Sequence, residues 1–439
     1  MGEKTINELK AYINQLAIHA KQAAIQLSVM TSEQKNASLL MIAEFLEKDS
    51  RLILEANALD IQEARLHGMG EGKLDRLRLT EERIRQMAQG LREVAKLPDP
   101  IGEVMESWQR EDGLQLEKVR VPMGVIAMIY ESRPNVTVDA AALTMKTGNA
   151  VILRGGKEAI HSNQALVKEI RNGLLQSGLP ETSVQLVERT ERESVDVLIK
   201  AKGMIDLVIP RGGAGLISHV TQNAYVPVIE TGVGNCHVYV DKLANPQKAI
   251  DIVINAKVQR PSVCNAAETL LVHRDIADEW LPSMVDSLIK NRVEVRACEK
   301  SLAILKSHGF EIAEPAYSGY GQVCAATESD YATEFLDYIM AIKIVSSLEE
   351  GIEHIQKYGT RHSEAIVTED EQHAEQFFRY VDAAAVYHNA STRFTDGFEF
   401  GFGAEIGIST QKLHARGPMG LREITSYKYL IRGDGHVRK

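Results

Sequence analysis

One thiol in this chain stands where chemistry is possible. Cys264 lies in the stretch QRPSVCNAAETLLVH, between a polar turn and an apolar run that is typical of a buried strand. The neighbouring Arg260 is expected to favour the thiolate over the thiol, and a thiolate can attack a carbonyl carbon and form a thioester. The alternative is an inert side chain, because free cysteine is most often a small buried hydrophobe.

The other reactive residue types form no recognisable site. Cys236, Cys298 and Cys324 are scattered without a C-x-x-C pair, so we expect neither a zinc site nor a disulfide framework. The histidines show no H-x-x-x-H or H-E-x-x-H spacing, and we expect no bound metal. The absence of a G-x-S-x-G elbow disfavours a serine hydrolase.

Two glycine-rich turns, LRGGKEA and IPRGGAG, each follow an apolar run and precede a helical segment. Backbone N–H groups at such a helix start suit a phosphate group. The residues expected to bind a phosphate-bearing cofactor are Arg154, Gly155, Gly156, Lys157, Arg211, Gly212 and Gly213. The alternative is that the glycines only allow tight turns, since neither turn has the spaced G-x-G-x-x-G fingerprint.

Composition restricts the class of protein. The chain has 439 residues, of which 44% are hydrophobic and 25% charged, and these values are ordinary for a folded protein of more than one domain. The net charge of −10 argues against nucleic acid as a partner. The N-terminus lacks an apolar core with a cleavage site, and no segment reaches membrane-spanning length, so we expect a cytoplasmic protein with no membrane partner.

The elements that must position these residues follow from the apolar pattern. Residues 5–98 predict a series of helices, one of which starts at Thr31 with Gln34 three positions later. Two alternating runs on either side of Asp112 and Gly113 predict a β-hairpin that projects from the body. Beyond residue 124, and again beyond residue 235, short apolar runs alternate with helical segments, which is typical of parallel sheets covered on both faces.

The predicted fold is therefore α/β, with two doubly wound domains and a projecting β-hairpin that serves as an oligomerisation arm. Residues 1–234 are expected to form the cofactor-binding domain, with the hairpin arm at 105–122. Residues 235–390 are expected to form the catalytic domain. Residues 391–439 are expected to fold back over the cleft as a loop and to end in a C-terminal oligomerisation segment.

The chain resembles the aldehyde dehydrogenase superfamily. The segment ETGVGNCHVYVD, followed by Cys264, is similar to that superfamily's glutamate on a glycine-rich strand end and its downstream nucleophilic cysteine. Further matching segments are VPMGVIAMIYESRPNVTVDAAALTMKTGNAVILRGGKEA, LVIPRGGAGLI and QRPSVCNAAETLLVH, and the resemblance covers essentially the whole chain. It implies an aldehyde-dehydrogenase-like fold.

The resemblance also implies an activity. We expect NADPH-dependent reduction of L-glutamyl 5-phosphate to L-glutamate 5-semialdehyde with release of phosphate, which is the second step of proline biosynthesis from glutamate. The thiolate of Cys264 would attack the acyl phosphate, and hydride from NADPH would reduce the resulting thioester. A homo-oligomer is expected, and a glutamate 5-kinase is a candidate partner.

Roles for individual residues follow from the same resemblance. Asn135 is a candidate oxyanion donor, with an N-cap of the following helix as the alternative. Glu230 is expected to have a positional or thiol-tuning role, and Glu334 to hold the nicotinamide ribose. Lys157, with help from Arg154, is expected to attract the 2′-phosphate of NADPH. The candidates for binding the substrate's charged groups are Arg133, Lys257, Arg260 and Arg393.

Two other functions remain open at this point. The first is a hydrolytic NAD(P)-dependent aldehyde dehydrogenase that uses Glu230 as the base. The second is a nucleotide-binding protein without catalytic activity. A requirement for phosphate distinguishes the reductase from the hydrolytic enzyme, and the effect of Cys264→Ala on turnover tests the non-catalytic protein.

Overall fold

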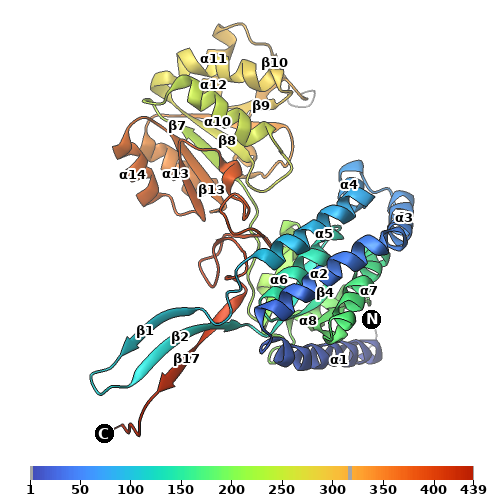
Figure 1. Cartoon of the computed structure of the whole chain (residues 1–439). Coiled ribbons are helices and arrows are strands. Elements are labelled where there is room, and N and C mark those ends of the chain that lie inside the picture. Colours follow the sequence, from blue (N-terminus) through green and yellow to red (C-terminus); the bar gives the residue numbers. More distant parts are fainter. Residues whose placement is uncertain (1–2, 315–318, 439) are drawn as a thin grey trace.

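A computed structural model describes residues 3–314 and 319–438, and it contains two α/β bodies and an extended arm (Figure 1). One body holds the N-terminal helices and a four-stranded sheet, and the other holds an eight-stranded sheet. The arm projects away from both bodies and carries the C-terminal strand. The predicted α/β fold with two sheets and a projecting hairpin is confirmed.

The predicted series of helices over residues 5–98 is confirmed. They are α1 (Glu3–Leu27), α2 (Ser32–Lys48), α3 (Ser50–Leu66), α4 (Glu71–Leu77) and α5 (Glu81–Lys96). The predicted helix start is also confirmed: the Thr31 hydroxyl accepts the backbone N–H of Gln34, and the Gln34 side chain accepts the backbone N–H of Thr31. Helix α2 packs against α5 and α7 (Ile160–Gln176) through one apolar face.

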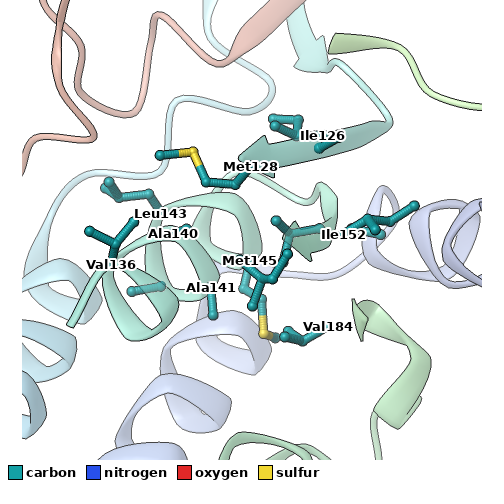
Figure 2. Packing of buried hydrophobic residues seen from close by; sticks show 14 of the residues in the cluster. Ile126, Met128, Val136, Ala140, Ala141, Leu143, Met145, Ile152 and Val184 are labelled. Carbon is teal, nitrogen blue, oxygen red and sulfur yellow. The ribbon is translucent and has the colours of Figure 1, made fainter. Parts of the chain in front are cut away.

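The first sheet is parallel, with the strand order β5-β4-β3-β6. Its strands are β3 (Val125–Tyr130), β4 (Ala150–Arg154), β5 (Val184–Leu186) and β6 (Leu207–Arg211), and its helices are α6 (Asn135–Lys146), α7, α8 (Glu193–Ile199) and α9 (Ala214–Asn223). Figure 2 shows Met128 and Ile152 from the strands packed with Leu143 and Met145 of α6. These strands are apolar throughout because both faces of the sheet are covered.

The second sheet is also parallel, and its strand order is β10-β11-β9-β12-β8-β7-β13-β14. Its main strands are β7 (Cys236–Val240), β8 (Ala267–His273), β9 (Glu294–Ala297), β12 (Ile339–Val345), β13 (Ser363–Val367) and β14 (Ala385–His388), with β10 (Ile312–Ala313) and β11 (Val323–Ala325) at one edge. The helices are α10 (Pro246–Val258), α11 (Arg274–Lys290), α12 (Glu299–Ser307), α13 (Leu348–Tyr358) and α14 (Glu371–Tyr380).

The arm has three strands, not two. The hairpin of β1 (Val104–Gln109) and β2 (Gln115–Pro122) is extended by β17 (Thr425–Arg432), which pairs with β2 in antiparallel register. Before reaching the arm, the tail forms η5 (Thr392–Phe394) and the short strands β15 (Ile408–Ser409) and β16 (Gly417–Pro418). None of the described helices is both long and apolar enough to cross a membrane.

The sheets bring together two sets of strand ends. In the first sheet the chain order reverses between β3 and β6, where the neighbours Tyr130 and Arg211 lie at the carboxyl ends. Ligands of open parallel sheets bind at such a point. In the second sheet, Cys264 and Cys236 lie at the amino ends of β8 and β7. The functional site is built from these loops and the tail.

Two helical glycines allow a test of how tightly the N-terminal helices pack. A Cβ added at Gly173 in α7 would lie 2.8 Å from the Cα of Ile42 in α2, whereas one added at Gly90 in α5 would meet nothing within 4 Å. We expect Gly173→Ala to destabilise this body by about 1–3 kcal/mol through overpacking. Gly90→Ala should instead stabilise it by about 0.5–1 kcal/mol, because alanine is the better helix former.

Thermal unfolding monitored by circular dichroism measures both variants. The two melting temperatures should move in opposite directions, by about 2–4 °C for each kcal/mol in a body of this size. Equal melting temperatures for Gly173→Ala and the unmodified protein would contradict the close approach of α2 and α7.

Candidate active site

The Cys264 loop is held by a backbone contact with the segment that enters β7. The carbonyl oxygen of Cys264 accepts a hydrogen bond from the Cys236 thiol at 3.2 Å. A Cβ on Gly234 would lie only 1.5 Å from the same oxygen, so no residue other than glycine fits there. Cys264 itself is half-buried, and Cys236 is completely buried. The position of the nucleophile candidate is therefore set by two residues on another strand.

The surroundings keep the Cys264 thiol protonated at rest. Burial, with the carboxylates of Glu405 and Glu334, raises the pKa of Cys264 to about 12, and Arg211 opposes this rise. Arg260, which was expected to favour the thiolate, is exposed, and the largest positive contribution at this thiol comes from Arg211. The role of Arg260 as an activating charge stays a prediction.

Guanidinium groups gather beside the thiol. Arg133 follows β3, and within the described residues its side chain makes no hydrogen bond or ion pair. Burial lowers the pKa of Arg133 to about 10, and the positive charges of Arg211, Arg76 and Arg260 act in the same direction. An unpaired, partly desolvated cation in a chain with a net charge of −10 indicates a site for an anion.

Arg393 is bound to the nucleophile loop itself. Its Nε donates to Gln259 at 2.7 Å, and one of its terminal nitrogens donates to the side-chain oxygen of Asn265. The Asn265 amide donates in turn to the carbonyl of Thr395 at 2.8 Å, and the Thr392 hydroxyl donates to the Asn265 carbonyl at 2.7 Å. The tail is therefore hydrogen-bonded to the Cys264 loop, and Arg393 has a structural role in addition to any contact with substrate.

The structure does not support Lys257 as a substrate-binding residue. Its ammonium is completely buried and forms an ion pair with the equally buried Glu268 at 2.5 Å. Burial lowers the pKa of Lys257 and raises that of Glu268 to about 7. A buried cation with a buried partner has no charge to offer a ligand, and separating the pair would be costly.

The two glycine-rich turns differ in structure. At the second turn, the backbone N–H of Gly213 donates to the Glu131 carboxylate at 3.1 Å, and a Cβ on Gly212 would lie 2.7 Å from the same carboxyl carbon. The N-terminus of α9 thus already receives an anionic side chain, and its exposed turn can accept a phosphate through the same donors.

At the first turn, Gly155 and Gly156 are buried and Lys157 is exposed. Arg154 is also buried, and it uses its guanidinium to bind Ser194 at 3.1 Å and the Gly155, Thr190 and Glu191 carbonyls at 2.8, 2.9 and 3.2 Å. Its donors are therefore committed to the protein, and the expectation that Arg154 helps to bind a phosphate is not supported. Lys157, by contrast, makes no hydrogen bond or ion pair with the described residues.

Three further candidates have distinct settings. Asn135 is the first residue of α6, which is capped by Pro134, so the N-cap alternative is wrong; its amide donates to Asp139 at 2.9 Å. Glu334 accepts the backbone N–H of Gly234 at 2.6 Å, next to the Cys264 loop, and burial raises its pKa. Glu230 is half-buried, and its backbone N–H donates to the side-chain oxygen of Gln411 at 2.9 Å.

Several residues of the site were missed by sequence reasoning. Glu405 and Arg76 come from distant parts of the chain and carry no motif, while Glu131 lies in ESRPN beside residues that were singled out. Gly234 and Cys236 were visible within ETGVGNC, but their contact with Cys264 depends on the register between β7 and β8. No group of three or more metal-ligating side chains is found within residues 3–314 and 319–438.

Comparison with known proteins identifies the class. The profile of the aldehyde dehydrogenase family matches residues 5–301. The chain belongs to the aldehyde dehydrogenase family, as the sequence predicted.

The most similar relatives belong to one branch. A gamma-glutamyl phosphate reductase of Desulforamulus reducens is 55% identical over 426 residues, which cover 97% of this chain and 99% of the relative. That of Moorella thermoacetica is 56% identical over 420 residues, covering 96% and 97%. The crystal structure of gamma-glutamyl phosphate reductase from Thermotoga maritima matches with a TM-score of 0.92 at 51% identity, covering 97% of this chain and 99% of that one. The aldehyde-dehydrogenase-like fold is therefore confirmed.

The charges around the thiol predict its reactivity. Because alkylation requires the thiolate, the rate of Cys264 modification by iodoacetamide should rise about tenfold per pH unit from pH 7 to pH 10 without a plateau. Arg211→Met should slow alkylation at each pH, since it removes the charge that favours the thiolate, whereas Arg211→Lys should retain most of the rate.

Arg260→Met is the matched control and should change the alkylation rate less than Arg211→Met, because Arg211 makes the largest positive contribution at the thiol. Peptide mass mapping assigns the label to Cys264 rather than to the other three free cysteines. A plateau below pH 9, or a larger effect of Arg260→Met than of Arg211→Met, would contradict the described arrangement.

Proposed function

We propose that this chain reduces L-glutamyl 5-phosphate to L-glutamate 5-semialdehyde with NADPH and releases phosphate, which is the second step of proline biosynthesis from glutamate. The observation that carries this proposal is identity of 54–56% over nearly the full length with relatives named gamma-glutamyl phosphate reductase. The protein is thus an oxidoreductase of the type glutamate-5-semialdehyde dehydrogenase. The roles of individual residues below are part of the proposal.

Cys264 is the proposed nucleophile. Its sulfur attacks the acyl carbon of the substrate, phosphate departs, and a thioester remains on the enzyme. The thiol is half-buried at the junction of the two sheets, and the nearby guanidinium of Arg211 favours the anionic sulfur. An oxyanion forms at the acyl carbon, and we propose the backbone N–H of Cys264 and the Asn135 amide as its donors. Asp139 accepts one N–H of the Asn135 amide, and the second N–H is available for this role.

The gathered arginines are the proposed site for the substrate's anionic groups. Arg133 has no partner among the described residues and shares the electrostatic field of Cys264 with Arg211. Charge-assisted hydrogen bonds to a phosphate or carboxylate would satisfy it. Arg260 and Arg393 remain candidates at the edge of this group, and Arg76 of α4 extends it.

A phosphate-bearing dinucleotide is the proposed cofactor. We propose that Arg211, Gly212 and Gly213 form the phosphate turn at α9 and that Glu334 holds the nicotinamide ribose. The free ammonium of Lys157 selects NADPH by attracting its 2′-phosphate. NADPH, when bound, supplies the hydride that reduces the thioester. In this proposal residues 1–234 bind the cofactor, residues 235–390 carry the nucleophile, and residues 391–439 complete the cleft and the arm.

The hydrolytic alternative needs a carboxylate base for water near the thioester. Glu230 would be that base, but the largest carboxylate contributions at Cys264 come from Glu405 and Glu334. We therefore propose a positional role for Glu230, and the identity with relatives named gamma-glutamyl phosphate reductase favours the reductase.

We further propose a cytoplasmic homo-oligomer that associates through the arm. Trp108, Tyr427, Tyr429 and Ile431 of the arm are exposed by 42–59%, and an apolar surface of this kind on an extended element is typical of an interface. A glutamate 5-kinase is the proposed supplier of the substrate. The free cysteines agree with a reducing compartment.

The experiment that tests this function follows NADP reduction with glutamate semialdehyde. Turnover should require inorganic phosphate, because phosphate releases the acyl group from Cys264 in this direction. Cys264→Ala should lose all measurable turnover while still binding NADPH, and Arg133→Met should raise the phosphate concentration needed for half-maximal rate. Turnover without phosphate would point to the hydrolytic enzyme, and full activity of Cys264→Ala would overturn the proposed mechanism.

A second experiment tests cofactor choice. Lys157→Glu places a negative charge where the 2′-phosphate is proposed to bind, so the KM for NADP should rise by at least about tenfold, equivalent to about 1.4 kcal/mol. The KM for NAD should change much less. Lys73→Glu, which alters an exposed lysine of α4, is the matched charge control and should leave both values unchanged. An equal rise for both cofactors would contradict the proposed role.

A further inference from the structure

A second carboxylate lies in the cleft besides the residues already assigned, and it belongs to the tail. Glu405 is half-buried, and its Oε2 accepts the backbone N–H of Gly397 at 2.9 Å. Its Oε1 makes no hydrogen bond with the described residues. The backbone of the following residue, Ile406, is also held in place, because the Arg211 side chain donates a hydrogen bond to its carbonyl. One carboxylate oxygen is thus anchored and the other is available.

The tail places Glu405 between the nucleophile loop and Arg211. Asn265, which follows Cys264, donates to the carbonyl of Thr395 at 2.8 Å, only two residues before Gly397. At its other end the same segment is bound by Arg211, whose charge acts on the Cys264 thiol. The tail segment that carries Glu405 is therefore hydrogen-bonded to the residue after Cys264 and to Arg211.

Among the charged groups near the thiol, Glu405 has the strongest effect on the pKa of Cys264, ahead of Glu334 and Arg211. Burial raises the pKa of Glu405 itself, Arg211 opposes this, and Asp396 adds to it. The remaining charges that face this pair are those of Arg133 and Arg393, which both interact with Cys264. A carboxylate with a raised pKa is a better proton acceptor than one in water.

The proposed reaction has two proton requirements at this place. The sulfur must lose its proton to attack, and the departing phosphate must gain one to leave as hydrogen phosphate. Glu334 is poorly suited to both, because its Oε1 binds the N–H of Gly234 at 2.6 Å and its carboxylate is the one proposed to hold the nicotinamide ribose. Glu405, in contrast, has no assigned ligand, and its Oε1 makes no hydrogen bond with the described residues.

We propose that Glu405 takes the proton of the Cys264 thiol as the sulfur attacks and gives that proton to the departing phosphate. This inference rests on the proposed function. In the step the sulfur–carbon bond forms and the bond between the acyl carbon and the phosphate oxygen breaks. The proton moves from sulfur to the carboxylate and then to the phosphate oxygen, so no solvent proton is needed and nothing is oxidised or reduced.

The test compares Glu405→Gln with the unmodified enzyme in two assays. In the phosphate-dependent NADP assay, kcat should fall by about 100-fold or more, the usual contribution of general acid–base catalysis, with KM values changed by less than about threefold. The acid limb of the pH profile of kcat should disappear. Alkylation of Cys264 without substrate should become faster at each pH, because a negative charge beside the thiol has been removed.

Two variants provide the controls. Glu399→Gln changes an exposed carboxylate on the same tail loop and should behave like the unmodified enzyme in both assays. Glu405→Asp keeps the acid on a shorter side chain and should recover part of kcat together with the acid limb.

Specific outcomes would overturn the inference. The first is a kcat of Glu405→Gln within about threefold of the unmodified enzyme. The second is a rise in KM alone, which would mean that Glu405 holds the substrate's ammonium. The third is a parallel loss of turnover and alkylation, which would indicate a structural role. An unmodified enzyme that shows no phosphate-dependent turnover would contradict the proposed function instead. In that case the alkylation assay still tests Glu405, because an unchanged rate in Glu405→Gln would exclude its coupling to the thiol.

Discussion

The whole site depends on one contact between two stretches of backbone. Gly234 approaches the Cys264 carbonyl so closely that a methyl group would not fit, and the neighbouring Cys236 thiol donates to the same oxygen. The segment that makes this contact is held from other directions too, since the N–H of Gly234 binds Glu334 and that of Asn235 donates to the Thr360 hydroxyl at 3.0 Å. The position of the Cys264 sulfur is thus set by the amino end of β7 in the second sheet.

The charges around the Cys264 sulfur keep it mostly protonated, and therefore weakly reactive, in the absence of substrate. Burial and two carboxylates favour the thiol, and the guanidinium groups at the carboxyl ends of the first sheet favour the thiolate. A thiol in this balance reacts slowly with oxidants, because sulfenic acid formation follows thiolate character. An anionic substrate that neutralises Arg133 and Arg211 also changes the field at the sulfur, so occupancy of the cleft and reactivity of the nucleophile are coupled.

The sequence predicted what depends on local pattern. The helical series, the capping box at Thr31, the hairpin and the two parallel sheets follow from periodicity and turn chemistry, and all are present. The identity of the thiol loop and its fold family came from motifs. Side-chain partnerships were not predictable, because they depend on which strands become neighbours: Lys257 pairs with Glu268, and Arg154 binds the loop before α8. Glu405 lies far from any motif, and only the folded tail brings it to the cleft.

The carboxylate of Glu131 on the N-terminal turn of α9 has a thermodynamic consequence for any phosphate that binds there. The Glu131 carboxylate accepts the Gly213 N–H in the absence of ligand, so it competes with a phosphate group for that donor. The measured dissociation constant of such a ligand is the intrinsic one divided by the fraction of molecules in which Glu131 has swung away. A phosphate group that binds at this turn must therefore displace a carboxylate, and its apparent affinity is lower than the N–H groups alone would give.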